Sequence, residues 1–332
     1  MMHPGKARTA LKRGAVIAAA NWQVVAIQSV ADTTFTLLLL VPIASGALLV
    51  ALLLGIDLAS VLSGRLAEML YRISQALVSR PVALASYLFG FLVVLTGGSL
   101  LMFLVKGGTV TVLAEADRVA GPVERPPLRT SAFRTAAAFS IGAFTTGAAT
   151  LFRRYLLLGI LLGLAYAVAA ALCLLTAFGL YRLGGDRTLV VGSVAALGVV
   201  LFVGLVTVIN VLYLLVQLVV AVDGASVGAG MRAVVRFIGA EFPRLWRVFV
   251  FTVLLLLVET LLSVVATWGF DLIAYVPVAG VVVLPLQLGA WLLRNLLFQY
   301  VGLTALSAYL SLYRGFAVPG AATASSTRKA AS

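Results

Sequence analysis

Long apolar runs fill most of the chain and alternate with shorter polar or amphipathic segments. Six of these runs approach the roughly 20 residues that a helix needs to cross the hydrocarbon core of a bilayer. They are continuous rather than alternating in polarity, which favours spanning helices over the strands of a β-barrel. The pattern predicts an all-α integral membrane protein with six transmembrane helices, at 35–54, 82–105, 155–181, 189–222, 245–268 and 295–313.

Amphipathic segments lie between these spans. Segments 131–152 and 225–242 carry an apolar stripe at helical spacing and precede a span, and 57–79 carries one on the opposite side of the membrane. Two further segments either lie at the membrane surface or cross it. We interpret 14–32 as an interfacial helix, with a seventh span as the alternative, and 271–293 as a re-entrant or interfacial segment.

An amphipathic segment followed by two spans occurs three times, in 8–117, 131–223 and 225–314. Parallel repeats of this kind occur in transporters, but any six-span bundle with interfacial linkers would give the same pattern. Both interpretations place 1–318 in a single polytopic membrane domain. The last segment, 319–332, is rich in Ala, Ser and Thr and is predicted to be a disordered cytoplasmic tail.

The composition and the charge agree with a membrane protein. The chain is 62% hydrophobic and only 11% charged, whereas a soluble domain has about 25% charged residues. The net charge of +13 is explained by Lys and Arg on the cytoplasmic side, since most of them fall there when the N-terminus is inside. We therefore expect cytoplasmic termini in a bacterial-type inner (plasma) membrane. The chain has no basic run with interleaved aromatic residues, so nucleic-acid binding is not expected.

Few residues offer catalytic or metal-binding chemistry. The single cysteine, Cys173, excludes a disulfide framework and a Cys-based metal site, and the single histidine, His3, argues against a His-ligated metal. The carboxylates Glu115, Asp117 and Asp223 end two helices, where we interpret them as solvated. A lipid-modifying enzyme would need these three to converge in one pocket. We find no set of nucleophile, base and orienting group, and expect neither enzymatic activity nor a cofactor.

Glu259, in the middle of the predicted fifth span, is the sharpest polar signal. An ionisable group at this depth costs a few kcal/mol, so it should face protein or a cavity. Counted from the cytoplasmic ends of their spans, Glu259 and Asn210 both lie roughly 20 Å deep at 1.5 Å per residue. This predicts a contact between them, which is either a proton or substrate site or a hydrogen bond that holds two helices together.

Arg294 is a second charge in an apolar stretch. It precedes Arg314 by a distance of about 30 Å in a helix, which is the whole thickness of the hydrocarbon core. We therefore expect Arg294 at the outer interface, directed towards Asp271. With Glu259 and Asn210, these two residues complete the candidate intramembrane polar site.

One stretch, 219–251, carries a resemblance to a known family. Its features are an acidic-glycine turn, a Ser, an Arg in an amphipathic helix and an aromatic-basic entry to the next span, here Asp223, Gly224, Ser226, Arg232, Trp246 and Arg247. The stretch resembles the membrane domain attached to some bacterial glycerophosphodiester phosphodiesterases, and the uncharacterised membrane proteins built like it. The catalytic domain of that family has no counterpart here, so the resemblance implies no hydrolase activity.

These observations favour a non-enzymatic multi-pass membrane protein that organises lipid or a partner membrane complex. The expected partners are membrane lipids and either another protein or further copies of the chain. The alternative is a transporter or channel with a mid-membrane polar site at Glu259 and Asn210. An aqueous cavity that reaches Glu259 would separate the two.

Overall fold

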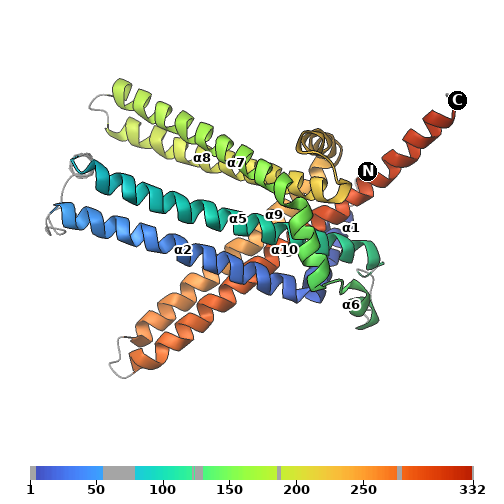
Figure 1. The fold of residues 1–332 in the computed structure, drawn as a ribbon, viewed down its shortest axis with the longest axis horizontal. Coiled ribbons are helices and arrows are strands. Elements are labelled where there is room, and N and C mark those ends of the chain that lie inside the picture. Colours follow the sequence, from blue (N-terminus) through green and yellow to red (C-terminus); the bar gives the residue numbers. More distant parts are fainter. Residues whose placement is uncertain are drawn as a thin grey trace. The chain divides into compact units, whose positions relative to one another are not determined.

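The computed structural model describes residues 5–54, 79–121, 123, 130–184, 188–274 and 279–330, and all regular elements within these ranges are α-helices (Figure 1). They are α1 (Gly5–Ala20), α2 (Trp22–Leu54), α5 (Pro81–Val119), α6 (Thr130–Ala136), α7 (Ile141–Gly184), α8 (Thr188–Asp223), α9 (Val227–Ala274) and α10 (Ala279–Ala330).

Six of the described helices are long and apolar enough to cross a membrane. The qualifying stretches are Trp22–Gly46, Leu84–Val119, Phe133–Thr176, Ala196–Asp223, Val227–Gly269 and Pro285–Ala317. Each overlaps one predicted span, which confirms the all-α, multi-pass architecture. The predicted outer helix at 57–79 lies, apart from Ser79, outside the described residues.

Segments 14–32 and 225–242 continue into the spans, whereas segment 131–152 is divided between the short helix α6 and the first part of α7. Segment 14–32 is divided between α1 and α2 at Asn21, and α2 then runs without interruption into the predicted first span. It is therefore not a single helix of its own, and the membrane-surface position of its first part stays a prediction. Segment 225–242 forms the first part of α9, which bends at Glu241 (φ −119°, ψ 15°). The bend precedes Pro243, whose ring and missing N–H interrupt a helix.

Two predictions near the C-terminus differ from the structure. Segment 271–293 is not an element of its own, because its ends belong to α9 and α10 and only 275–278 lie outside the described residues. The backbone of α10 also continues to Ala330, through the tail from 319 for which the composition predicts disorder. The many alanines there favour helix, since alanine has the highest helix propensity.

The chain divides into two compact units, Ile27–Val105 and the combination of Met1–Ala26 with Lys106–Ser332. In the smaller unit α2 and α5 form a hairpin. A Cβ added at Gly98 would lie 2.1 Å from the ring of Phe35, so the two helices approach closely at this glycine. The predicted threefold repeat stays a prediction.

The larger unit has a buried core in which α1 packs against α10 and one end of each of α5, α7, α8 and α9 contributes side chains. Its largest fully buried side chains include Ile17, Leu113, Tyr155, Leu218, Phe237 and Leu310. Gly14 brings α1 against α10, because a Cβ there would lie 2.3 Å from the carbonyl oxygen of Thr304. This contact fixes the N-terminal helix within the core.

Beyond the core, α7 pairs with α8 and α9 with α10 to form two helical hairpins, which we call the arms (160–212 and 250–298; Figure 1). Large apolar side chains in α8 are exposed as far as Leu212 and buried from Tyr213. In α10 the same change falls between Phe298 and Leu303. Exposed apolar helices suit contact with lipid. The second half of the predicted sixth span therefore belongs to the core and not to an arm.

Candidate intramembrane polar site

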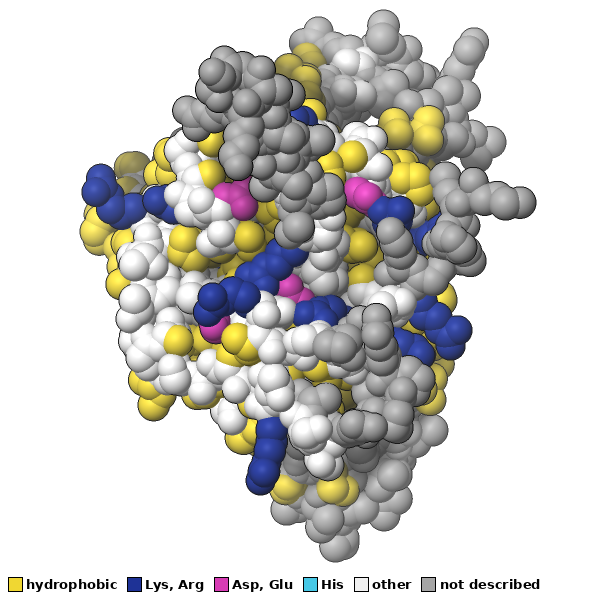
Figure 2. Space-filling model, turned by 90° about the vertical axis from the view of Figure 1, so that its right-hand side faces the viewer, with side chains coloured by type: hydrophobic (Ala, Val, Ile, Leu, Met, Phe, Trp, Pro, Cys, Tyr) yellow, Lys and Arg dark blue, Asp and Glu magenta, His cyan; other side chains and the backbone are white. Residues whose placement is uncertain are grey.

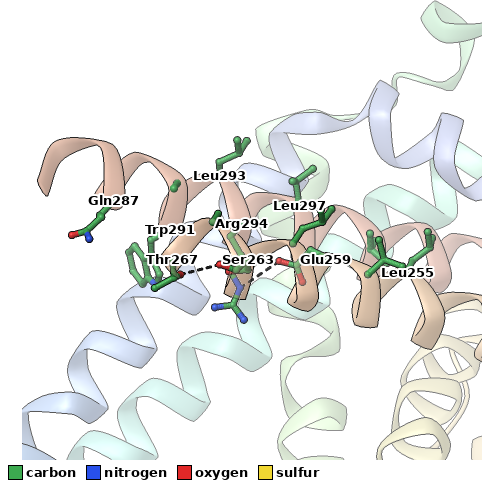
Figure 3. Close-up of a pocket in the computed structure, with 14 residues that line it drawn as sticks. Leu255, Glu259, Ser263, Thr267, Gln287, Trp291, Leu293, Arg294 and Leu297 are labelled. Atoms are coloured by element: carbon green, nitrogen blue, oxygen red, sulfur yellow. Dashed lines mark hydrogen bonds and ion pairs between the residues drawn. The ribbon is translucent and has the colours of Figure 1, made fainter. Parts of the chain in front are cut away.

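Glu259 of α9 and Arg294 of α10 face each other across the arm that these two helices form (Figure 3). Glu259 Oε1 lies 3.4 Å from Arg294 Nε. The Glu259 side chain is 12% exposed and the Arg294 side chain 47% exposed. The sequence placed both residues in the candidate site, and the structure joins them as an ion pair.

The pair lies in a groove of about 730 Å³ between α9 and α10. Figure 3 shows Trp291, Thr267 and Gln287 on one side of the pair and Leu255 on the other. The remaining lining is mostly apolar and comes from Val258, Leu262, Ala266, Ala290, Leu293, Leu297 and Val301, with the polar Ser263. The groove therefore offers one ion pair within a mostly apolar surface.

Among the described residues, no group donates a hydrogen bond to the Glu259 carboxylate. Both oxygens of this carboxylate are enclosed. At 3.4 Å the contact is an ion pair and not a short charge-assisted hydrogen bond. The Thr267 hydroxyl donates to the carbonyl oxygen of Ser263, at 2.9 Å, and so does not serve the pair. The Arg294 guanidinium can therefore still donate to an acceptor on another molecule.

The predicted contact between Glu259 and Asn210 is wrong. Asn210 lies in the other arm, where its Oδ1 accepts a hydrogen bond from the hydroxyl of Tyr166. The error came from counting depth from the cytoplasmic ends of the predicted spans. Counted from the last buried residue of the core, Asn210 is about 5 Å along α8 from Tyr213, whereas Glu259 is about 17 Å along α9 from Val248.

Arg294 is likewise closer to the core than predicted. Arg314, from which its depth was counted, lies in the core, so Arg294 is only about 14 Å along α10 from Leu303. This places it level with Glu259. The side chain of Asp271, its predicted neighbour, lies outside the described residues.

The three carboxylates at the helix ends do not form a joint pocket. Asp117 is buried and binds Arg13 Nε at 2.6 Å and Arg314 Nη1 at 3.1 Å. Asp223 accepts a hydrogen bond from the Tyr313 hydroxyl, and Glu115 pairs with Arg118. The prediction of a solvated helix end is therefore wrong for Asp117. Tyr313 and Arg314 are adjacent in α10, and they bind Asp223 at the end of α8 and Asp117 near the end of α5. No spacing in the sequence indicates this link.

Sequence reasoning also missed Asn21. It is fully buried at the break between α1 and α2, and its Nδ2 donates to the carbonyl oxygens of Ile17 (2.9 Å) and Ala136 (2.8 Å). Its Oδ1 accepts from the backbone N–H of Ala138 at 2.9 Å. The signal available in the sequence is an amide inside an apolar segment.

Comparisons with known proteins identify no relative. No family model, no curated protein and no solved structure matches the chain. The resemblance of 219–251 to the membrane domain of glycerophosphodiester phosphodiesterases stays a prediction. The described part of the chain is all-α, with six helices that are long and apolar enough to cross a membrane.

Proposed function

We propose that this protein is a non-enzymatic membrane protein that organises a membrane complex by holding a transmembrane helix of a partner in the groove between α9 and α10. One observation carries the proposal: the half-exposed guanidinium of Arg294, backed by the enclosed carboxylate of Glu259. The partner helix would supply a carboxylate or another strong acceptor at the same depth.

The energetic reason is the cost of an exposed cation in hydrocarbon. A charged side chain at mid-membrane costs about 3 kcal/mol or more on insertion scales. Glu259 offsets part of this cost, but its distance from Arg294 and the exposure of the guanidinium leave N–H groups that lipid tails cannot satisfy. An acceptor on a neighbouring helix would satisfy them and give the contact a defined depth.

The lining of the groove is suited to a helix. Ser263, Ala266 and Ala290 are small, and small residues let helix backbones approach closely in a membrane. Leu293 and Leu297 provide exposed apolar surface beside them. In this proposal the core lies on the cytoplasmic side of a bacterial-type inner membrane, and lipid covers the other exposed faces of the arms.

The first test is water access to position 259, which separates this proposal from a transporter. A cysteine replaces Glu259 in a Cys173→Ala chain and is treated in intact membranes with a small water-soluble thiol reagent. We expect no labelling, while a cysteine replacing the exposed Ser226 reacts. Rapid labelling at 259 would contradict the proposal and favour an aqueous path through the arm.

The second test detects the partner directly. A photoreactive residue replaces Leu293 in the groove or, as a matched control, Leu175 in the other arm, which is similarly exposed. We expect a discrete protein adduct from position 293 only, and its loss on Arg294→Gln. Equal adducts from both positions, or an adduct that survives Arg294→Gln, would contradict the proposal. An adduct of twice the chain's mass would identify a second copy as the partner.

A further inference from the structure

The first part of α9, from Val227 to the bend at Glu241, has two contrasting faces. Val234 and Phe237 are buried in the core. Arg232 and Arg236 are exposed, together with the apolar side chains of Met231 and Val235, and these four residues line a shallow hollow with Ala229. The segment therefore presents two cations and an apolar surface on the same side.

An aromatic stack follows directly after the bend. The rings of Phe242 and Trp246 lie 6.3 Å apart and those of Trp246 and Phe249 5.4 Å apart, in stacked arrangements. Phe242 and Trp246 are more than half exposed. Exposed aromatic rings of this kind are typical of the interface between headgroups and hydrocarbon. The stack therefore marks the depth of the lipid headgroups beside Arg232 and Arg236.

The described chain does not neutralise these two arginines. Glu241 pairs with Arg244, and Asp223 accepts a hydrogen bond from Tyr313. No carboxylate among the described residues forms an ion pair with Arg232 or Arg236, and the contact of Arg232 is a long one, 3.5 Å to the carbonyl oxygen of Gly228. Figure 2, which looks at the molecule from the right of Figure 1, shows Lys and Arg side chains spread over that face with few Asp or Glu beside them.

We infer that Arg232 and Arg236 bind the phosphate of an anionic phospholipid in the leaflet next to the core. Residues four apart on a helix are neighbours, so two like charges there repel each other unless an anion lies between them. The guanidinium fork matches the oxygens of a phosphate. Met231 and Val235 then contact the upper part of the acyl chains, which a free phosphate ion does not have.

The test uses the fluorescence of Trp246 as a local reporter. The other tryptophans, at 22, 268 and 291, are replaced by Phe, and the chain is reconstituted in vesicles containing brominated phosphatidylglycerol or brominated phosphatidylcholine. Bromine quenches the indole on contact, so the quenching curves give the relative affinity of the two lipids at this position. We expect a preference of roughly tenfold for phosphatidylglycerol, from the attraction of two basic residues to an anionic headgroup.

The matched variants decide the assignment. Arg232→Gln with Arg236→Gln should abolish the preference, whereas Arg134→Gln with Arg153→Gln, an equal change of charge at two other exposed positions, should leave it. If both double variants lost the lipid preference equally, the preference would come from diffuse surface charge and not from a site at Arg232 and Arg236. If millimolar inorganic phosphate removed the preference for phosphatidylglycerol, the ligand would be the free phosphate ion and not a lipid.

A measurement on a chain with all its tryptophans guards against misfolding of the single-tryptophan chain. Short-chain phosphatidylglycerol, added in a neutral detergent, should raise the Tm of this chain more than phosphatidylcholine does. The difference should disappear in the Arg232→Gln, Arg236→Gln chain and persist in the control pair. The same Tm increment for both lipids would overturn the inference, and this result is independent of any partner bound in the α9/α10 groove.

Discussion

Asp117 and Asn21 in the core and the Glu259–Arg294 pair in the α9/α10 arm differ in how far their polar groups are satisfied. In the core, Asp117 binds two arginines and Asn21 makes three hydrogen bonds to backbone groups. In the arm, the carboxylate of Glu259 accepts no hydrogen bond from the described chain, and Arg294 stays half exposed. Buried polar groups in folded proteins almost always find partners. The difference indicates that Asp117 and Asn21 are satisfied within one chain, and in the proposed function the Glu259–Arg294 pair is completed by another molecule.

The largest effect is expected at Asp117. Replacing it with alanine leaves Arg13 and Arg314, which are 16% and 26% exposed, without their shared carboxylate. Removing one partner of a buried ion pair costs about 3–5 kcal/mol, so Asp117→Ala should lower the free energy of unfolding by about that amount. Reversible unfolding in detergent measures it.

Glu115→Ala is the matched control, because Glu115 is two residues away and its pair with Arg118 is exposed. We expect little change in stability there. If both variants lost the same free energy of unfolding, the ion pair at Asp117 would not stabilise the core. The comparison between core and arm would then be wrong in what it says of the core.

The sequence predicts the six spans well, because an apolar run of about 20 residues reports the solvent around a helix directly. It does not separate burial in lipid from burial in protein. Residues 303–313 of α10 are apolar and were predicted to span the membrane, yet Leu303, Leu306 and Leu310 are buried in the core. Hydropathy is the same in both environments, so only the packing of α1 against α10 reveals the difference.

The candidate site was predicted only in part for the same reason. Glu259 and Arg294 stand out as charges in apolar runs, but their pairing depends on the offset between α9 and α10. Glu259 lies 15 residues before the end of α9 and Arg294 lies 15 residues after the start of α10, so the position of the turn between the two helices sets the pairing. The sequence predicts 271–293 as a segment of its own and therefore does not place this turn. Asp117 binds Arg13 and Arg314, which lie 104 and 197 positions away from it in the sequence. No local pattern specifies contacts over such separations.

The next effect in size concerns the packing of the core. Gly14→Ala would place a Cβ 2.3 Å from Thr304 O and 2.9 Å from Ala308 N, and both are backbone atoms that cannot move aside alone. Overpacking of this kind costs about 1–3 kcal/mol, and we expect the upper part of that range in thermal unfolding. Gly163→Ala, on the arm, meets no atom within 4 Å and should leave stability unchanged or slightly raised.

A somewhat smaller loss is expected at Asn21. Asn21→Ala would leave the carbonyl oxygen of Ala136 and the N–H of Ala138 without their partner. Unsatisfied buried groups cost about 1–3 kcal/mol, and we expect about 2 kcal/mol from the unfolding midpoint. Asn210→Ala on the arm, which removes one hydrogen bond from an exposed side chain, should cost clearly less. Equal losses would show that arm and core use their amides alike.

The smallest effect on stability, and the sharpest test of the comparison, is expected at Arg294. Arg294→Gln removes a half-exposed cation whose pairing distance is long, so the free energy of unfolding of the isolated chain should change by less than about 1 kcal/mol. The photo-adduct at position 293 should nevertheless disappear, because the shorter, uncharged amide of glutamine does not replace the guanidinium as a charged donor to the acceptor on the partner helix. Glu259→Gln keeps the guanidinium and should keep the adduct. If Arg294→Gln instead destabilised the isolated chain as much as Asp117→Ala, the ion pair would hold the two helices of the arm together as Asp117 holds the core. The groove would then need no other molecule to complete it.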